Sequence, residues 1–156
     1  MSSGPNASKS DYVASIRARI GHDLLLLPGV TAVIRDRERF LLARHAHSGL
    51  WSLIGGAVEP GEEPKDAVIR EVREETGASI AVAGIIGAYG GQPMMVDYPN
   101  GDRVAYVTTA FECHLLSAAA PDMDEILELG WFPRDRIAEL PRRHWIDRVL
   151  ADAAMA

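Results

Sequence analysis

With 156 residues, 47% of them hydrophobic, the chain has the length and composition of one globular domain, which excludes a second domain of ordinary size. A net charge of −6, from 16 basic and 22 acidic residues, disfavours a nucleic-acid polymer as partner, because such binding needs clustered lysine and arginine. The single cysteine excludes an intramolecular disulfide, and no apolar run approaches the roughly 20 residues that span a bilayer, so we expect a cytoplasmic protein without a membrane partner.

The N-terminal part of the chain predicts a disordered tail, a helix and a hairpin. Residues 1–8 are mostly small and polar and predict the tail, after which apolar residues recur at helical spacing as far as Gly21. The leucine segment of residues 24–29, four leucines followed by Pro28 and Gly29, predicts a buried or docked extended run. Two strands follow, at residues 30–34 and 40–44, and the short charged turn between them predicts that they pair as a hairpin.

A helix over residues 63–76 is predicted by the residues at its two ends. Pro64 suits the first helical position, where its missing N–H costs nothing, and Gly77 suits the left-handed residue that ends a helix. Between them, Val68, Ile69 and Val72 form an apolar stripe that predicts the buried side of the helix. The glycines and proline that precede residue 63 predict a turn that leads into it.

Residues 59–75 hold seven carboxylates against three basic side chains. On the predicted helix Glu71, Glu74 and Glu75 fall within about a third of a turn of one another, so three like charges share one face. A solvated surface with ion pairs along the helix is one explanation. The other is a hard divalent cation, because Mg²⁺ takes carboxylate oxygens and bridges them to phosphate. We favour the cation because Glu75 lies at the edge of the buried side.

The rest of the chain predicts further strands and two helices. The predicted elements are central strands at 79–88 and 104–116, a turn at 100–101 between Tyr98 and Arg103, a last strand at 126–132, a short helix at 133–140 and a C-terminal helix at 144–155. Trp145, Val149 and Leu150 are expected to face inward from the last helix. Strands with helices before, between and after them predict an α/β fold whose sheet is covered on both faces.

The acidic helix and the glycine turn before it resemble the Nudix box, in which Gly is followed after five residues by Glu, and after seven more by Arg-Glu-apolar-any-Glu-Glu-any-Gly-apolar. The matching positions are Gly56, Glu62, Arg70, Glu71, Val72, Glu74, Glu75 and Gly77. Ala78 ends the pattern with a smaller side chain than usual, and Ile54 stands where proline usually precedes the two glycines. Over about residues 30–140 the chain resembles the Nudix hydrolase superfamily of MutT-like pyrophosphohydrolases.

The resemblance implies the family's α/β/α sandwich, with a mixed β-sheet between helices, in a single domain over residues 9–156 that carries an N-terminal helical extension. It also implies hydrolysis of the pyrophosphate bond of a nucleotide-derived small molecule, of the ADP-ribose or nucleoside triphosphate type, by water that Mg²⁺ activates, with Mn²⁺ as a substitute. Two alternatives stay open: a catalytically silent nucleotide sensor or binding module with this fold, and a hydrolase that removes damaged nucleoside triphosphates.

Matching positions give roles to individual residues. The resemblance implies that Glu71, Glu74 and Glu75 are metal ligands and that the carbonyl of Gly56 joins them. Arg70 would pair with acidic side chains of the preceding loop and hold these ligands in register, and its expected partner there is Glu62.

The general base is open between Glu71, in the box, and Glu125, six residues before Trp131 in the loop before the last strand. Asp124 and Glu128 are neighbours that could take the place of Glu125.

The sequence also suggests residues that could contact the substrate and roles for the N-terminal helix. Pro93 lies fifteen residues after Ala78, where a proline accompanies ADP-ribose hydrolysis in part of the family, but we favour a turn as the explanation of this proline. Side chains that could line the substrate site are His45, His47, Tyr89, Met94, Met95 and Tyr98. Three roles are open for the N-terminal helix: a homodimer contact, a wall of the substrate site, or cover for the sheet edge.

Overall fold

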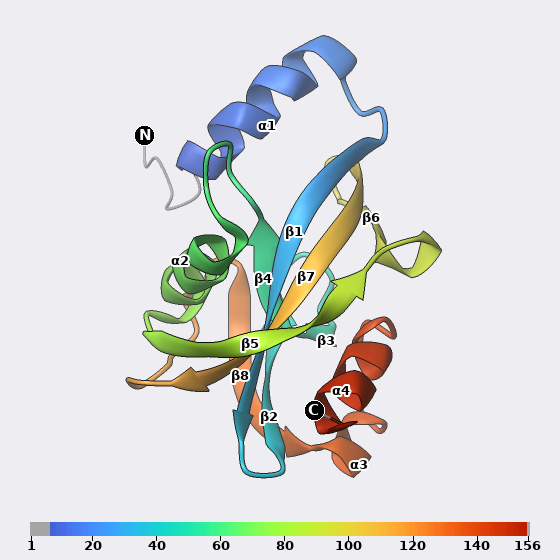
Figure 1. The fold of residues 1–156 in the computed structure, drawn as a ribbon. Helices are drawn as coiled ribbons and strands as arrows, with labels where there is room; N and C mark the ends of the chain where they lie inside the picture. Colours follow the sequence, from blue (N-terminus) through green and yellow to red (C-terminus); the bar gives the residue numbers. More distant parts are fainter. Residues whose placement is uncertain (1–6, 156) are drawn as a thin grey trace.

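A computed structural model describes residues 7–155 and shows a curled mixed β-sheet with helices on both of its faces (Figure 1). The elements are α1 (Ala7–Ile20), β1 (Leu25–Asp36), β2 (Arg39–His45), β3 (Trp51–Ser52), β4 (Ile54–Ala57), α2 (Pro64–Thr76), β5 (Ile80–Tyr89), the 3₁₀ turn η1 (Gln92–Met94), β6 (Met95–Asp97), β7 (Arg103–Leu115), β8 (Ile126–Pro133), α3 (Arg134–Ile137) and α4 (Ile146–Met155). The predicted α/β/α sandwich is confirmed.

The long strand β1 organises the sheet. The main strand order is β3-β2-β1-β7-β5, in which β1 and β7 run parallel and the other pairs are antiparallel. β4 pairs with β1, β6 with β7, and β8 with β2. In the β1–β4 register Val30 lies opposite Gly56 and Thr31 opposite Gly55. This pairing fixes the two glycines against the middle of β1, where α2 begins its approach to the sheet.

Two of the predicted strands differ from those observed. The predicted extended run at 24–29 and the predicted strand at 30–34 form one strand, β1, which starts at Leu25 and continues through Pro28 while pairing with β7. The prediction of a central strand at 79–88 is wrong, because β5 is an edge strand that pairs with β7. Register shifts interrupt that pairing near Gly84 and Gly87, as is common at sheet edges, and Ile85 is 69% exposed.

Two apolar layers cover the sheet, as the sequence predicted. On one face α2 contributes Val68 and Val72 to a cluster that also holds Ile54, the residue in the usual proline position. On the other face α4 contributes Val149 and Leu150, which confirms that they point inward. Removing such side chains from water stabilises a fold by about 1.5–3 kcal/mol each, so both helices are held by packing.

Helix ends agree with the sequence for α2 but less well for the C-terminal helices. Gly77 ends α2 in the left-handed region, with φ of 71°, and its N–H donates to the carbonyl of Arg73. α3 ends at Ile137 and α4 begins at Ile146, so both are shorter than predicted. The residues between them form a loop that pairs with β3, and its partly buried Trp145 packs against the second apolar layer.

The N-terminal helix stands at one end of the molecule, above β1 and β6 (Figure 1). Six residues of the predicted tail lie outside the described residues, and Ala7 and Ser8 belong to α1. Tyr12 is 46% exposed, and Val13, Ile16 and Ile20 are half-buried and belong to neither apolar cluster, so the expected apolar stripe of α1 is not part of the core. Between residues 7 and 155 the structure contains no helix with the length and hydrophobicity needed to cross a membrane.

Cys113 of β7 gives a test of the core. Its side chain is buried, and burial raises the pKa of the thiol to about 12, with a smaller contribution from the charge of Glu112. Because the thiolate is the reactive form, we expect no labelling by a thiol reagent at pH 7.5 in the folded protein and rapid labelling in denaturant. Fast labelling without denaturant, followed by absorbance, would show that β7 is accessible.

Candidate active site

The glycine turn and helix α2 meet at Gly56. A Cβ atom built on Gly56 would lie 2.4 Å from Oε1 of Glu71, so any larger residue here would collide with that carboxylate. Glu71 has no exposed surface, which means that its carboxylate lies behind the backbone of the turn. A buried carboxylate needs a positive partner, because loss of hydration strongly disfavours its charge.

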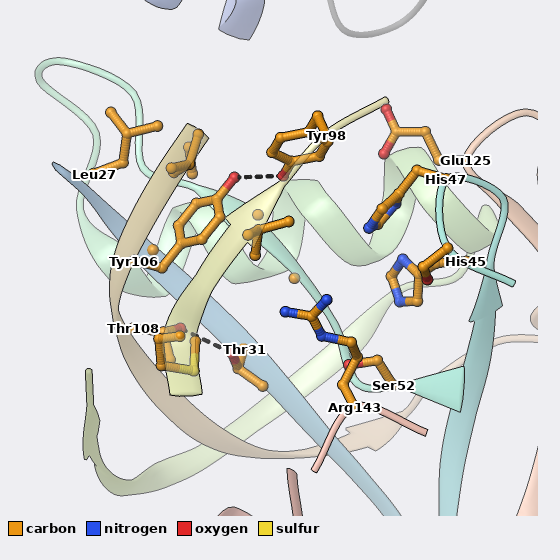
Figure 2. Close-up of a pocket in the computed structure, with 18 of the residues that line it drawn as sticks. Leu27, Thr31, His45, His47, Ser52, Tyr98, Tyr106, Thr108, Glu125 and Arg143 are labelled. Atoms are coloured by element: carbon orange, nitrogen blue, oxygen red, sulfur yellow. Dashed lines mark hydrogen bonds between the residues drawn. The ribbon is translucent and has the colours of Figure 1, made fainter. Parts of the chain in front are cut away.

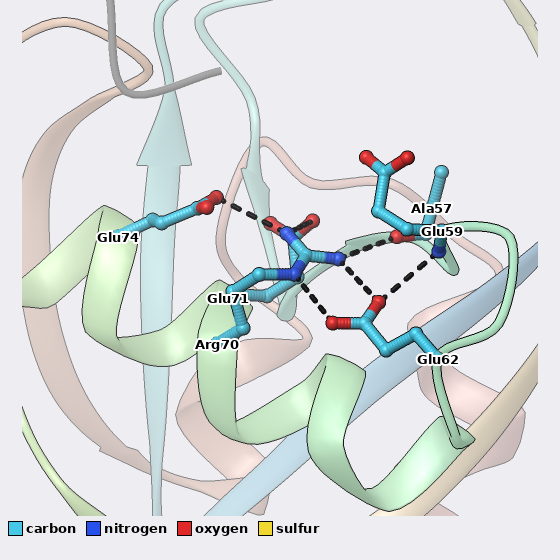
Figure 3. Close-up of polar contacts among 6 residues, drawn as sticks. All are labelled: Ala57, Glu59, Glu62, Arg70, Glu71 and Glu74. Carbon is cyan, nitrogen blue, oxygen red and sulfur yellow. Dashed lines mark hydrogen bonds and ion pairs between the residues drawn. The ribbon is translucent and has the colours of Figure 1, made fainter. Parts of the chain in front are cut away.

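Arg70 supplies that partner and lies at the centre of a carboxylate cluster (Figure 3). Its Nε donates to Glu62 Oε2 at 2.7 Å, and Nη2 donates to Glu62 Oε1 at 2.9 Å and to the carbonyl of Ala57 at 3.0 Å. Its Nη1 donates to Glu71 Oε1 at 3.0 Å and to Glu74 Oε2 at 3.3 Å. These five hydrogen bonds match the five N–H donors of a guanidinium, and the predicted pair of Arg70 and Glu62 is present.

The cluster also fixes the loop between β4 and α2. Glu62 Oε1 accepts a further hydrogen bond from the backbone N–H of Glu59 at 3.1 Å. The hydrogen bonds that Arg70 donates to Glu62, together with the charge of Glu71, hold the pKa of Arg70 far above its usual range. Arg70 is therefore charged at pH 7, and it ties the loop, the turn and the helix together.

A cavity of about 690 Å³ opens on the other side of the turn (Figure 2). Gly55, Gly56 and Ala57 line it, and so does Glu75, whose side chain is 3% exposed. Glu71 and Glu74 do not line it. The three glutamates of the Nudix box thus lie in two places. Glu71 and Glu74 are hydrogen-bonded to Arg70, and Glu75 lies at the cavity wall. The volume is within the range of small-molecule sites in proteins.

The loop before β8 brings Glu125 to the same cavity. Asp122 N–H donates to the carbonyl of Glu75 at 3.1 Å, which attaches this loop to the end of α2. Asp122 Oδ1 accepts from the N–H groups of residues 124, 125 and 126, so the loop is tightly folded. Asp124 also lines the cavity, whereas Glu128 pairs with Arg44 at 3.1 Å instead. Which acid serves as general base stays a prediction.

Aromatic and histidine side chains form the remaining walls (Figure 2). The hydroxyls of Tyr98 and Tyr106 lie 3.0 Å apart, and the rings of Tyr98 and His47 have centroids 5.3 Å apart. Burial is the main cause that lowers the pKa of His45, to about 4, and the nearby His47 contributes less. Nε2 of His45 donates to the carbonyl of Leu53 at 3.2 Å. His45 is therefore neutral at pH 7, with Nδ1 as a hydrogen-bond acceptor.

The other predicted substrate contacts divide into two groups. Met94 lines the cavity, as Tyr98 does, while Met95 and Pro93 are not among the lining residues. Tyr89 is buried against α4, where its hydroxyl donates to Asp152 at 2.7 Å. Tyr89 is thus a core residue and is not among the residues that line the cavity.

The arrangement of turn, helix and sheet matches that of a known family. A family model for the NUDIX domain matches residues 25–153. The chain belongs to the Nudix family. The match begins at the first residue of β1, so the family region is longer than residues 30–140 and includes most of the leucine segment.

Relatives and solved structures agree with this membership. The NAD-capped RNA hydrolase NudC of Pseudomonas aeruginosa is 32% identical over 133 residues, which are 84% of this chain and 45% of that protein. A MutT-like protein of Streptomyces ambofaciens is 32% identical over 107 residues, 69% of this chain and 63% of that protein. The solved structure of a NUDIX hydrolase from Nitrosomonas europaea has a TM-score of 0.70 and 26% identity, and the likeness covers 84% of this chain and 90% of that one. The chain spans about half the length of the NudC relatives that it matches.

The Nudix site fits a hard divalent cation. Across residues 7–155 no three histidine, cysteine or acidic side chains converge in a way that could hold a metal ion by themselves. Mg²⁺ does not need them, because it usually takes one or two protein carboxylates and completes its shell with water and substrate phosphate. Glu75 could supply such a carboxylate, because it lies at the cavity wall, and Gly56 has no side chain to block close approach.

Sequence reasoning missed several residues of the Nudix cavity. Thr31 and Thr108 share a buried hydrogen bond of 2.8 Å at its base, and Tyr106 forms part of its wall. Arg143 enters from the loop before α4. The threonines and Tyr106 lie on strands whose sequences predict only alternation, and Arg143 follows another arginine in a loop, so no local pattern distinguished them.

Gly56→Ala tests the close approach in this Nudix turn. The added Cβ would lie 2.4 Å from a carboxylate that is buried and bonded to Arg70, so it cannot move away freely. We expect the free energy of unfolding to fall by about 1–3 kcal/mol, measured by urea denaturation. Gly84→Ala is the control, because nothing lies within 4 Å of its Cβ position. Equal stability of the two variants would contradict the assigned contact.

Proposed function

We propose that this chain hydrolyses the pyrophosphate bond of a nucleotide-linked small molecule with the help of Mg²⁺, or of Mn²⁺ in its place. One observation carries the proposal: Glu75, on the Nudix helix, and Glu125, on a distant loop, line one cavity of nucleotide size next to Gly56. Membership of the Nudix family supports the reaction, and the NudC relatives, named as hydrolases of NAD-capped RNA, support a nucleotide-linked substrate.

Each residue of the site has a defined part in this proposal. Glu75 would bind the cation together with the carbonyl of Gly56, and Glu71 and Glu74 would complete or support that site from the Arg70 cluster. When bound, the cation lowers the pKa of a coordinated water and neutralises charge on the phosphates. Glu125 would accept the proton of the attacking water, since it lines the cavity whereas Glu71 lies behind Gly56. Arg70 acts as a positioning residue.

The proposal is tested by incubating the purified chain with Mg²⁺ and a panel of substrates. The panel contains ADP-ribose, NADH, dinucleoside polyphosphates, nucleoside triphosphates and a short NAD-capped RNA. We expect release of a nucleoside monophosphate from at least one of the diphosphate-linked compounds, lost in EDTA and restored by Mn²⁺. No turnover of any compound would favour the silent nucleotide sensor, and turnover of triphosphates alone would favour the hydrolase of damaged nucleotides.

A further inference from the structure

Two arginines line the cavity, and only one of them is engaged by an acid. Arg17 donates to the carbonyls of Gly21, Asp23 and Arg103, and its Nε lies 3.7 Å from the carboxylate of Asp102. For Arg143, no carboxylate of residues 7–155 lies within 4.0 Å, and Nη2 makes one long hydrogen bond, 3.4 Å, to the carbonyl of Met95. Most of its five donors are therefore available to a ligand.

The loop before α4 holds Arg143 in place by its backbone. The backbone N–H of Arg143 donates to the carbonyl of Trp51 at 3.0 Å, and the N–H of Trp51 donates to the carbonyl of Pro141 at 2.9 Å. The neighbouring Arg142 is bound to Asp147 through two hydrogen bonds, of 2.8 and 2.7 Å. With its neighbours fixed, the Arg143 guanidinium extends into the cavity beside His45 (Figure 2).

The guanidinium of Arg143 is the positive charge in its part of the cavity, because the two histidines beside it are neutral. Burial lowers the pKa of both His45 and His47, and the positive charge of Arg143 lowers both further, so neither histidine is charged at pH 7. Arg143 is then the positive group beside the two histidines. The acidic residues of the lining are Glu75, Asp102, Asp124 and Glu125, and of these Asp102 is paired with Arg17. An anionic ligand that enters the cavity therefore meets attraction at Arg143.

We propose that Arg143 binds a phosphate group of the substrate and thereby makes the cavity prefer nucleoside diphosphates to uncharged nucleosides. The planar fork of a guanidinium matches the spacing of phosphate oxygens, which a single point charge does not. The inference takes its class of ligand from the proposed function. It assigns to a residue outside the Nudix box the role of holding the phosphate chain.

The test measures binding without turnover. In EDTA at pH 7.5, ADP and adenosine are titrated into ¹⁵N-labelled wild-type protein and the Arg143→Ala variant, and the Kd of each is obtained from amide chemical shifts. We expect wild type to bind ADP more tightly than adenosine. In Arg143→Ala the ADP affinity should fall by about 10- to 100-fold, while the adenosine affinity stays the same. Arg143→Lys, which keeps the charge and loses the fork, should lie between the two.

Arg134→Ala is the matched control, because Arg134 is exposed, lies outside the cavity lining and changes the net charge equally. Its ADP affinity should equal that of wild type. The spectra also report whether each variant is folded. Equal ADP affinity in wild type and Arg143→Ala, or a wild type that does not distinguish ADP from adenosine, would overturn the inference. Because no step requires hydrolysis, ADP preference without any turnover in the substrate panel would refute the proposed function alone.

Discussion

Glu75→Gln is expected to lower metal-dependent hydrolysis by about 10²- to 10³-fold, the range found when one electrostatic contact to a transition state is removed. Glu75 is the box glutamate that lines the cavity, and glutamine keeps its size while removing its charge. The measurement is kcat/KM for the best substrate of the panel at saturating Mg²⁺. The fold should be retained, because removing one of two like charges four residues apart relieves repulsion with Glu71.

Glu63→Gln provides the comparison for this variant. Glu63 precedes α2, is exposed and makes no side-chain capping bond. It carries the same charge near the same helix without reaching the cavity, so we expect wild-type kcat/KM. Full activity in Glu75→Gln would show that Glu75 is not a metal ligand, and equal losses in both variants would point to a general effect of helix charge.

Arg70→Ala is expected to have the largest effect on stability. It would leave Glu71, which has no exposed surface, without the guanidinium that now balances its charge. Removing one partner of a buried ion pair costs about 3–5 kcal/mol, and we expect about 3 kcal/mol because Arg70 itself keeps 22% of its side-chain surface exposed. Urea denaturation followed by circular dichroism measures this loss.

Two further variants define the cause of that loss. Arg70→Lys keeps the positive charge but cannot make five hydrogen bonds, so its stability should be intermediate. Arg73→Ala removes an exposed arginine from the same helix, and we expect a change within about 0.5 kcal/mol. If Arg70→Ala lost less than about 1 kcal/mol, the value typical of surface ion pairs, Glu71 would not need Arg70 as a counter-charge.

The Nudix helix could be predicted closely because its signals are local. Pro64 and Gly77 fix its two ends through backbone chemistry that acts within a few residues, and the observed helix starts at Pro64 and ends one residue before Gly77. The pairing of Arg70 with Glu62 was implied by the matching motif positions, and the structure places both residues within one turn-helix unit. The resemblance to a known motif then supplied chemistry that spacing alone left open between a solvated surface and a cation site.

Strand positions were harder to predict because pairing depends on distant residues. β3 and β4 contain two and four residues, too few to show alternation, and they exist because β2 and β1 offer partners. The apolar composition of β5 suggested a central strand, yet its place at the edge is decided by which strands compete for β7.

The sequence by itself determined the helix, its caps, the family and the two-sided cover of the sheet, because periodicity and motif spacing act over short distances. Tertiary structure alone decided which charges face the cavity. It placed Glu125 beside the end of α2 through the contact of Asp122 with Glu75, and it turned Arg143 inward while Arg142 paired with Asp147. Such choices depend on backbone hydrogen bonds between segments far apart in the chain, which no local pattern encodes.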